Sequence, residues 1–236
     1  MRRHDGRQLH ALADGELREL AERYSRCTVD VGTGDGRFVL RTAREDADVL
    51  VIGVDAVADG LAPTARKAQR KEKKGGAPNA LFLIAAAEDL PGPLEGLADR
   101  VMVNFPWGSL MRGLVLPTPA LLRGLAEVAK PGGELVALLN LSVFQDADYL
   151  RRLGIPTDLE DLEQRLQGEE FAARYAANGW EILETTALAD AVPHRTTWGQ
   201  KLVRGSRRRS VLLRARRVGF APSESPSGDP RRDPAG

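Results

Sequence analysis

Two carboxylates accompany a glycine-rich turn in the first quarter of the chain. The turn spans Asp30–Gly36 and reads DVGTGDG, and Asp55 follows Gly36 by 19 residues, directly after an apolar run. Glycines let a backbone turn sharply and approach a ligand with no Cβ in the way. A carboxylate placed like Asp55 can accept hydrogen bonds from both hydroxyls of a ribose. The spacing therefore predicts a site for an adenosine-containing ligand.

The acidic residues of this turn discriminate between cofactors. Dinucleotide sites use the spacing G-x-G-x-x-G and seat a pyrophosphate on a helix N-terminus. Here the spacing is G-x-G-x-G, Asp30 precedes it and Asp35 lies inside it. Carboxylates repel a diphosphate and attract a cationic amino acid, so the pattern favours S-adenosylmethionine, with its positive sulfonium and ammonium groups, over NAD. A tight turn that binds nothing is the alternative, and Asp55 argues against it.

Two tryptophans lie in settings that suit a nucleobase. Trp107 stands in the run Asn104–Ser109, which reads NFPWGS and resembles, imperfectly, the Asn-Pro-Pro-aromatic motif of enzymes that methylate base nitrogens. Trp198 lies in a long basic segment, where an aromatic ring can stack on a base for about 1 to 3 kcal/mol. Two rings approaching from opposite sides would clamp the base. A core anchor is the alternative for Trp107, and Trp180 is expected to be structural.

Charge is segregated along the chain although the net charge is only +1. Residues 61–76 contain six bases and one acid, residues 195–217 contain nine bases and no acid, and the acids gather in residues 145–170. If the fold brings the two basic blocks together, they form one face that binds a polyanion. Separate solvated surfaces are the alternative.

Apolar runs that alternate with helical patterns predict the elements that position these residues. The expected strands are 27–31, 49–54, 80–87, 100–105, 134–141, 180–188 and 210–218. This alternation is typical of a doubly wound α/β fold with a mostly parallel sheet, whose ligands lie at the carboxyl ends of the strands. Ala87 and Glu88 should then flank an adenine. Asp14 is expected to cap the first helix, Thr118 to open a helix that ends at Lys130, and residues 146–178 to form one or two more helices.

Composition bounds the class of protein. The chain has 236 residues, 42% of them hydrophobic, which suits one globular domain, and no apolar run is long enough to cross a bilayer. Cys27 is the only cysteine and the three histidines are scattered, so no metal site is expected. We expect a cytoplasmic protein, because the first residues lack a secretory signal. Residues 1–13 are expected to form a hairpin extension around Asp5 and Gly6, residues 14–218 the domain, and residues 219–236 a disordered tail.

Taken together, the motifs resemble those of the aminoglycoside-resistance 16S rRNA methyltransferases of the Kam and Npm type, which modify N1 of adenine-1408. The resemblance covers residues 15–217 and rests on DVGTGDG, on KGGxxN at Lys74–Asn79, on AAAE at Ala85–Glu88, on FPWGS at Phe105–Ser109, and on Thr-Trp before the second basic block. It implies a class I methyltransferase with a Rossmann-like, seven-stranded sheet that is mostly parallel and has an antiparallel last strand. It departs from the family at Leu153, where a basic residue is usual before the Gly-x-Pro turn.

The resemblance also assigns roles to residues. S-adenosylmethionine is expected to contact Asp30, Gly32, Gly34, Asp55, Ala87, Glu88, Asn104, Ser109 and Thr196. Trp107 and Trp198 would sandwich the flipped adenine as the catalytic residues. The RNA would be held by Arg66, Lys67, Arg70, Lys71, Lys201, Arg204, Arg207, Arg208 and Arg209. The expected partner is 16S rRNA within the assembled 30S subunit, bound by a monomer without metal or membrane.

Three other functions remain open at this point. An adenine methyltransferase acting on the exocyclic amine would share every cofactor residue, and Asn104 near Pro106 suits it. A small-molecule methyltransferase would not need the second basic block, and a non-enzymatic RNA-binding protein would not need Asp30 and Asp55.

Overall fold

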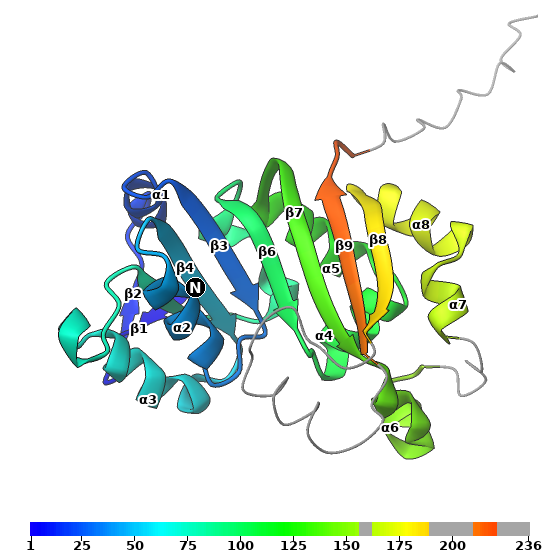
Figure 1. The fold of residues 1–236 in the computed structure, drawn as a ribbon, viewed down its shortest axis with the longest axis horizontal. Helices are drawn as coiled ribbons and strands as arrows, with labels where there is room; N and C mark the ends of the chain where they lie inside the picture. The colour runs from blue at the N-terminus through cyan, green and yellow to red at the C-terminus, as the bar shows by residue number, and fades with distance from the viewer. Residues whose placement is uncertain (156–161, 189–209, 221–236) are drawn as a thin grey trace, which may run out of the picture.

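A nine-stranded sheet forms the centre of the computed structural model, which describes residues 1–155, 162–188 and 210–220 (Figure 1). The strands lie in the order β2-β1-β5-β4-β3-β6-β7-β9-β8. Their bounds are β1 (Arg2–His4), β2 (Leu9–Ala11), β3 (Arg26–Val31), β4 (Val49–Asp55), β5 (Ala80–Ile84), β6 (Ala98–Asn104), β7 (Ala129–Asn140), β8 (Trp180–Leu188) and β9 (Ser210–Arg217).

The direction of the strands confirms the predicted fold class. Strands β3 to β7 pair in parallel, and β9 lies antiparallel between β7 and β8. Several predicted boundaries were wrong, and the largest difference is in β7, which begins at Ala129 and not at Glu134. The strand expected to reach Ala87 ends at Ile84, and the helix expected to end at Lys130 ends at Val128, because β7 already begins at Ala129 and pairs irregularly with β6 there.

The predicted count of seven strands was wrong, because residues 2–11 add a hairpin to the sheet. Strand β1 pairs with β2 and also, antiparallel, with β5. It thereby covers the edge of β5, which would otherwise expose unpaired backbone groups. The turn of the hairpin packs tightly on the next helix layer, since a Cβ on Gly6 would overlap the backbone of Arg66. The Arg66 guanidinium donates hydrogen bonds to the Gly6 carbonyl at 3.3 and 3.1 Å.

Helices cover both faces of the sheet (Figure 1). They are α1 (Glu16–Ala21), α2 (Arg37–Glu45), α3 (Ala58–Ala68), α4 (Gly108–Val115), α5 (Pro119–Val128), α6 (Ala147–Arg152), α7 (Leu162–Leu166) and α8 (Glu169–Ala176). Buried side chains of α2 and α3 pack with Phe82 of β5 on one face. On the other face, α1, α4, α5 and α8 pack with Val29 and Val31 of β3. Trp180 is fully buried there, and its indole N–H donates to the Leu122 carbonyl at 2.9 Å, which confirms its structural role.

Two predictions about helices were also wrong. Helix α1 begins after Gly15 rather than after a cap at Asp14, and the Glu16 carboxylate instead accepts from the Ala13 N–H at 3.1 Å. The acidic stretch forms three short helices, α6 to α8, in the part of it that the structure describes, where one or two were expected. None of the helices in the described ranges is long and apolar enough to cross a membrane.

Candidate active site

The glycine-rich turn leaves the carboxyl end of β3 and bends back over β4. The Val54 carbonyl accepts hydrogen bonds from the N–H groups of Gly32, at 2.8 Å, and Thr33, at 3.1 Å. Gly32 has a φ of +73°, and a Cβ there would lie only 2.6 Å from a methyl carbon of Leu110 on α4. Position 32 therefore favours glycine for its backbone conformation, and a larger residue would also displace the end of the Leu110 side chain.

Asp55 is the last residue of β4 and is fixed by the backbone around it. One carboxylate oxygen accepts from the Gly34 N–H at 2.8 Å and the other from the Val57 N–H at 2.9 Å. Each oxygen keeps a second lone pair, so both can still accept a hydroxyl. This arrangement fits the ribose diol predicted for Asp55. Asp35, in contrast, serves the start of α2, where it pairs with Arg37 at 3.4 Å.

A cavity of about 420 Å³ lies against the carboxyl ends of β3 to β6. This volume is in the range of small-molecule sites. Its walls are Val31, Gly32, Gly34, Val54–Val57, Ala85–Glu88 and Phe105–Leu110. Six of the predicted cofactor residues meet there, namely Gly32, Gly34, Asp55, Ala87, Glu88 and Ser109. Asp55 and Glu88 are the charged side chains among the described lining residues, and both are acidic, so the cavity suits a cationic ligand better than a diphosphate.

Two further predicted cofactor residues, Asp30 and Asn104, lie on neighbouring strands at the same edge but are not among these lining residues. Asp30 is 1% exposed, and its carboxylate accepts a hydrogen bond from the Asn104 amide at 2.8 Å. Burial raises the pKa of Asp30 to about 7, and the negative charge of Asp55 acts in the same direction. The Asn104 amide oxygen is buried and has no hydrogen-bond partner among the described residues. The site thus combines the carboxylate of Asp30 with the unused acceptor oxygen of Asn104. An ammonium group fits such a site, because it is positively charged and donates hydrogen bonds.

The NFPWGS run forms a strained turn between β6 and α4. Phe105 is buried and has a φ of +51°, a backbone conformation that residues other than glycine rarely adopt. Its N–H donates to the Leu138 carbonyl at 2.8 Å. Two residues later Trp107 is 51% exposed and lines the cavity. The reading of Trp107 as a core anchor is therefore wrong, and its ring is available to a flat ligand.

The first basic block lies on α3 and the segment that follows it. Arg66, Lys67, Arg70 and Lys71 are all exposed, and Arg66 also holds the N-terminal hairpin through Gly6. The KGGxxN motif in this region is structural, because a Cβ on Gly76 would overlap the Arg70 carbonyl. Asn79 is buried and bonds the carbonyls of Ala43, Asp46 and Val49, which ties the end of α2 to β4.

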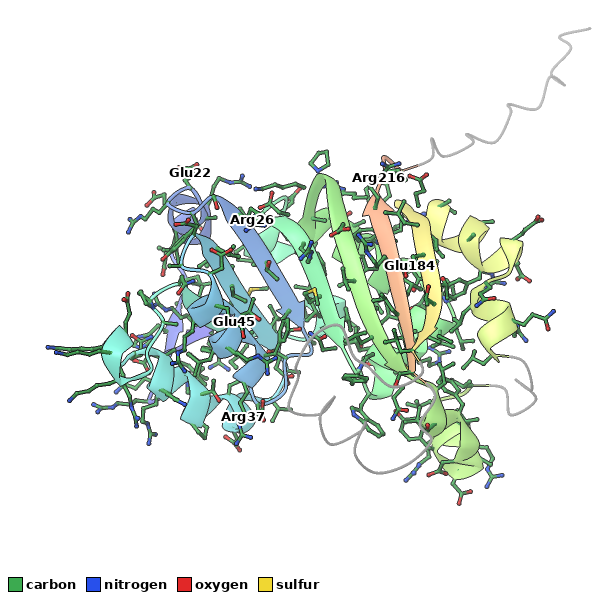
Figure 2. The ribbon with its side chains drawn as sticks, viewed as in Figure 1. Glu22, Arg26, Arg37, Glu45, Glu184 and Arg216 are labelled. Atoms are coloured by element: carbon green, nitrogen blue, oxygen red, sulfur yellow. The ribbon has the colours of Figure 1, made fainter. Side chains whose placement is uncertain are left out.

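The remaining predicted site residues lie outside the described part of the chain. They are Thr196, Trp198, Lys201, Arg204, Arg207, Arg208 and Arg209. Three other bases of the second block belong to β9 and are engaged in the sheet. Arg214 pairs with Glu134 and Glu184, and Arg216 pairs with Glu181 at 2.6 Å; Figure 2 labels Arg216 and Glu184 on the neighbouring strands β9 and β8. Arg217 donates to the Ala129 carbonyl.

Sequence reasoning missed two residues at this edge. Val57 lines the cavity and is 63% exposed, and its place two residues after Asp55 was a signal that could have found it. Tyr149 contacts the turn that carries Trp107. Nothing in its sequence neighbourhood pointed to that contact, because 41 residues separate it from Gly108.

Comparisons with known proteins agree with this geometry. A family model described as 16S rRNA (adenine(1408)-N(1))-methyltransferase matches residues 2–217. A protein of that name from Streptoalloteichus tenebrarius is 35% identical over 216 residues, which are 90% of this chain and 96% of the relative. The crystal structure of the protein of that name from Catenulisporales acidiphilia has a TM-score of 0.81 at 33% identity, covering 93% of this chain and 100% of the other. That of the aminoglycoside resistance methyltransferase NpmB1 has a TM-score of 0.80 at 40% identity, covering 92% and 99%.

The family match therefore includes the glycine-rich turn, the acidic cavity and the turn that presents Trp107. A mutant of the Catenulisporales protein has been described with cosubstrate SAM, the class of ligand that the acidic cavity suits. The chain belongs to the 16S rRNA (adenine(1408)-N(1))-methyltransferase family.

Proposed function

We propose that this chain transfers the methyl group of S-adenosylmethionine to N1 of adenine-1408 of 16S rRNA in the assembled 30S subunit, and so confers aminoglycoside resistance. The proposal depends on one observation above the others: a half-exposed tryptophan at an acidic cavity, in a chain whose family is named for this reaction. The enzyme would act as a monomer in the cytoplasm, where its ribosomal substrate lies.

The described residues suit the two ends of the cofactor. Asp55 would accept the ribose hydroxyls, while Ala87 and Glu88 would flank the adenine. Asp30 and Asn104, just below the walls of the cavity, would receive the amino acid end, where burial strengthens an ion pair. When bound, S-adenosylmethionine supplies an electrophilic methyl group on a positively charged sulfur.

The target nitrogen needs no general base. Adenine N1 carries a lone pair at neutral pH, so no side chain has to remove a proton before transfer. The contribution of the protein is then mainly orientation, which supplies up to about 7 to 11 kcal/mol in favourable cases. Trp107 would cover one face of the adenine and Trp198 the other, and their rings would also favour the positive charge that moves onto the base.

The basic residues would offset the free energy of flipping the base. Extracting a base from its stack costs a few kcal/mol. Lys67, Arg70 and Lys71 are exposed and near one another in the chain. They would bind phosphates of a folded RNA and so recognise the shape of its surface rather than its base sequence. Recognition by shape favours the assembled 30S subunit over free 16S rRNA.

The position of Asn104 argues against methylation of the exocyclic amine. An enzyme of that type would use this side chain to accept a hydrogen bond from the substrate amine. Here the Asn104 amide oxygen, the acceptor that such a substrate would need, is buried, and Asn104 is not among the described residues that line the cavity.

Primer extension through the decoding region tests the proposed function. Ribosomal RNA from cells that express the chain should give a stop at adenine-1408, because a methyl group on N1 blocks the Watson-Crick edge. The Trp107→Ala variant serves as the negative control, and N6 monomethylation would give no stop. Methyl counting on 30S subunits and on purified 16S rRNA tests the substrate, and equal activity on both contradicts recognition of the assembled particle.

A further inference from the structure

Tyr149 joins α6 to the turn that carries Trp107. Its phenol oxygen accepts a hydrogen bond from the Gly108 N–H at 3.0 Å. Its ring meets the Trp107 indole edge to face, with centroids 5.7 Å apart and planes at 78°. The same side chain therefore holds both the backbone after Trp107 and the ring of Trp107 itself.

Tyr149 adds support to a turn whose backbone has unusual torsion angles on both sides of Trp107. Phe105 and Gly108 both have positive φ, at 51° and 60°. Gly108 is the first residue of α4, so its N–H has no partner inside that helix. Trp107 is 51% exposed, and Tyr149 supplies the ring contact that the structure shows for it. An exposed indole at a strained turn rotates freely unless a neighbour limits it.

Tyr149 is itself held in place by the helix α6 to which it belongs. Its backbone N–H donates to the Asp146 carboxylate at 2.9 Å, which caps α6. The next residue, Leu150, is buried, with 2% of its surface exposed. Helix α6 is thus anchored at both its start and its buried side, and Tyr149 transmits that anchoring to the turn.

We propose that Tyr149 is a positioning residue that fixes the plane of Trp107, the surface on which the target purine stacks. This inference rests on the proposed function. Orientation is the main contribution of the protein to methyl transfer, so a tilted indole would turn adenine N1 away from the methyl donor. Tyr149 touches neither the base nor the cofactor in this role, and it acts only through Trp107 and Gly108.

Two substitutions separate the hydrogen bond from the ring contact. Tyr149→Phe removes the hydroxyl and keeps the ring, while Tyr149→Ala removes both. With 30S subunits and saturating S-adenosylmethionine, we expect kcat to fall about 3- to 10-fold for Tyr149→Phe, the loss typical of one hydrogen bond. For Tyr149→Ala we expect about 10²-fold, as for a misplaced reactant. The KM for 30S subunits and the affinity for S-adenosylmethionine should change less than twofold in both variants, because neither group contacts RNA or cofactor.

Tyr175→Phe is the matched control. Its hydroxyl donates to the Leu114 carbonyl at 2.9 Å in the core, away from the turn, so the variant loses a tyrosine hydrogen bond without touching Trp107. It should unfold at a lower urea concentration and keep the kcat of the unchanged chain. A fall in kcat for Tyr149→Phe that exceeds the fall for Tyr175→Phe then reflects position rather than stability.

A spectroscopic measurement follows the ring contact without any substrate. The near-UV circular dichroism band of Trp107 is obtained as the difference between the unchanged chain and Trp107→Ala. This band should persist in Tyr149→Phe and disappear in Tyr149→Ala. Wild-type turnover by Tyr149→Ala, or a Trp107 band that survives in it, overturns the proposal. If even the unchanged chain fails to methylate adenine-1408, the proposed function is wrong, yet the band still supports or refutes the role of Tyr149 in fixing Trp107.

Discussion

Replacing the buried Asp30 with asparagine should stabilise the folded protein at pH 8 and remove its methyltransferase activity. Asp30 is 1% exposed, its carboxylate accepts a hydrogen bond from the Asn104 amide, and the Thr33 hydroxyl also lowers its pKa, yet desolvation by burial outweighs both. A carboxylate removed from water to this extent is costly to ionise. Asparagine has nearly the same shape and carries no charge, so the Asp30→Asn substitution removes that cost without opening a cavity.

The size and sign of the effect follow from the pKa of Asp30. Burial raises this pKa from 3.8 to about 7 in the folded chain. Between these values the folded state binds a proton that the unfolded state has released, so the free energy of unfolding falls as pH rises through this window. The gap corresponds to about 4 kcal/mol at 1.36 kcal/mol per pKa unit. At pH values well below 3.8 the carboxyl group of Asp30 is protonated in both states and adds no such cost.

Urea unfolding of the full chain at pH 5, 6, 7 and 8, without cofactor, measures this directly. The difference in unfolding free energy between Asp30→Asn and the unchanged chain should grow in favour of the variant by at least 2 kcal/mol between pH 5 and pH 7, allowing for partial relaxation of the site. Asp35→Asn is the control, because it replaces a partly exposed carboxylate of the same turn. S-adenosylmethionine should stabilise the unchanged chain more than the variant, since its ammonium group would offset the buried charge.

The reasoning about Asp30 is refuted by either of two results. One is a difference profile that stays level from pH 5 to pH 8, which would mean that Asp30 is not buried as a costly charge. The other is a variant that is less stable than the unchanged chain at pH 8, which would mean that the Asn104 hydrogen bond outweighs the desolvation of the carboxylate.

The other predictions concern the stacking of the target base, the binding of RNA and the loop that contains Gly76. Trp107→Ala should abolish methylation of 30S subunits while S-adenosylmethionine affinity, measured by calorimetry, changes less than about threefold, because the ring stacks on the base. Lys67→Glu should weaken 30S binding more at 50 mM than at 200 mM salt, as expected for a lost phosphate contact, and filter binding at the two salt concentrations measures this. Gly76→Ala should lower the thermal midpoint by several degrees, because the added Cβ would overlap the Arg70 carbonyl. An unchanged midpoint in calorimetry would show that the loop gives way.

The sequence predicted the central strands well because their signal is local. Val49–Val54 is an almost continuous apolar run, the pattern of a parallel strand buried on both faces, and Cys27–Val31 has an apolar residue at every second position and ends at the glycine-rich turn. The hairpin at residues 2–11 was not predicted as part of the sheet, because its strands are three residues long and β1 is entirely polar. Its place depends on the tertiary contact between Gly6 and Arg66, which no periodicity reveals.

The site was predictable where chemistry depends on neighbours in the chain. Gly32 and Asp55 were found because the turn and the strand that position them are adjacent to them in sequence. Which of the site residues are buried, and which pair with other elements, could not be predicted in the same way. That Asp30 lies below the lining residues, and that Arg66 is tied to the hairpin, depends on packing between elements far apart in the chain.

The location of the site also follows from physical features that are unfavourable for folding. Among the described residues, Asp30 is the one buried carboxylate and Phe105 the one residue other than glycine with positive φ. The two most exposed large apolar side chains in the same part of the chain are Val57 and Trp107. Three of these four residues line the cavity and the fourth, Asp30, lies next to it at the end of β3. Features that cost stability persist where function requires them, so their convergence marks this edge of the sheet as the active site independently of the family match.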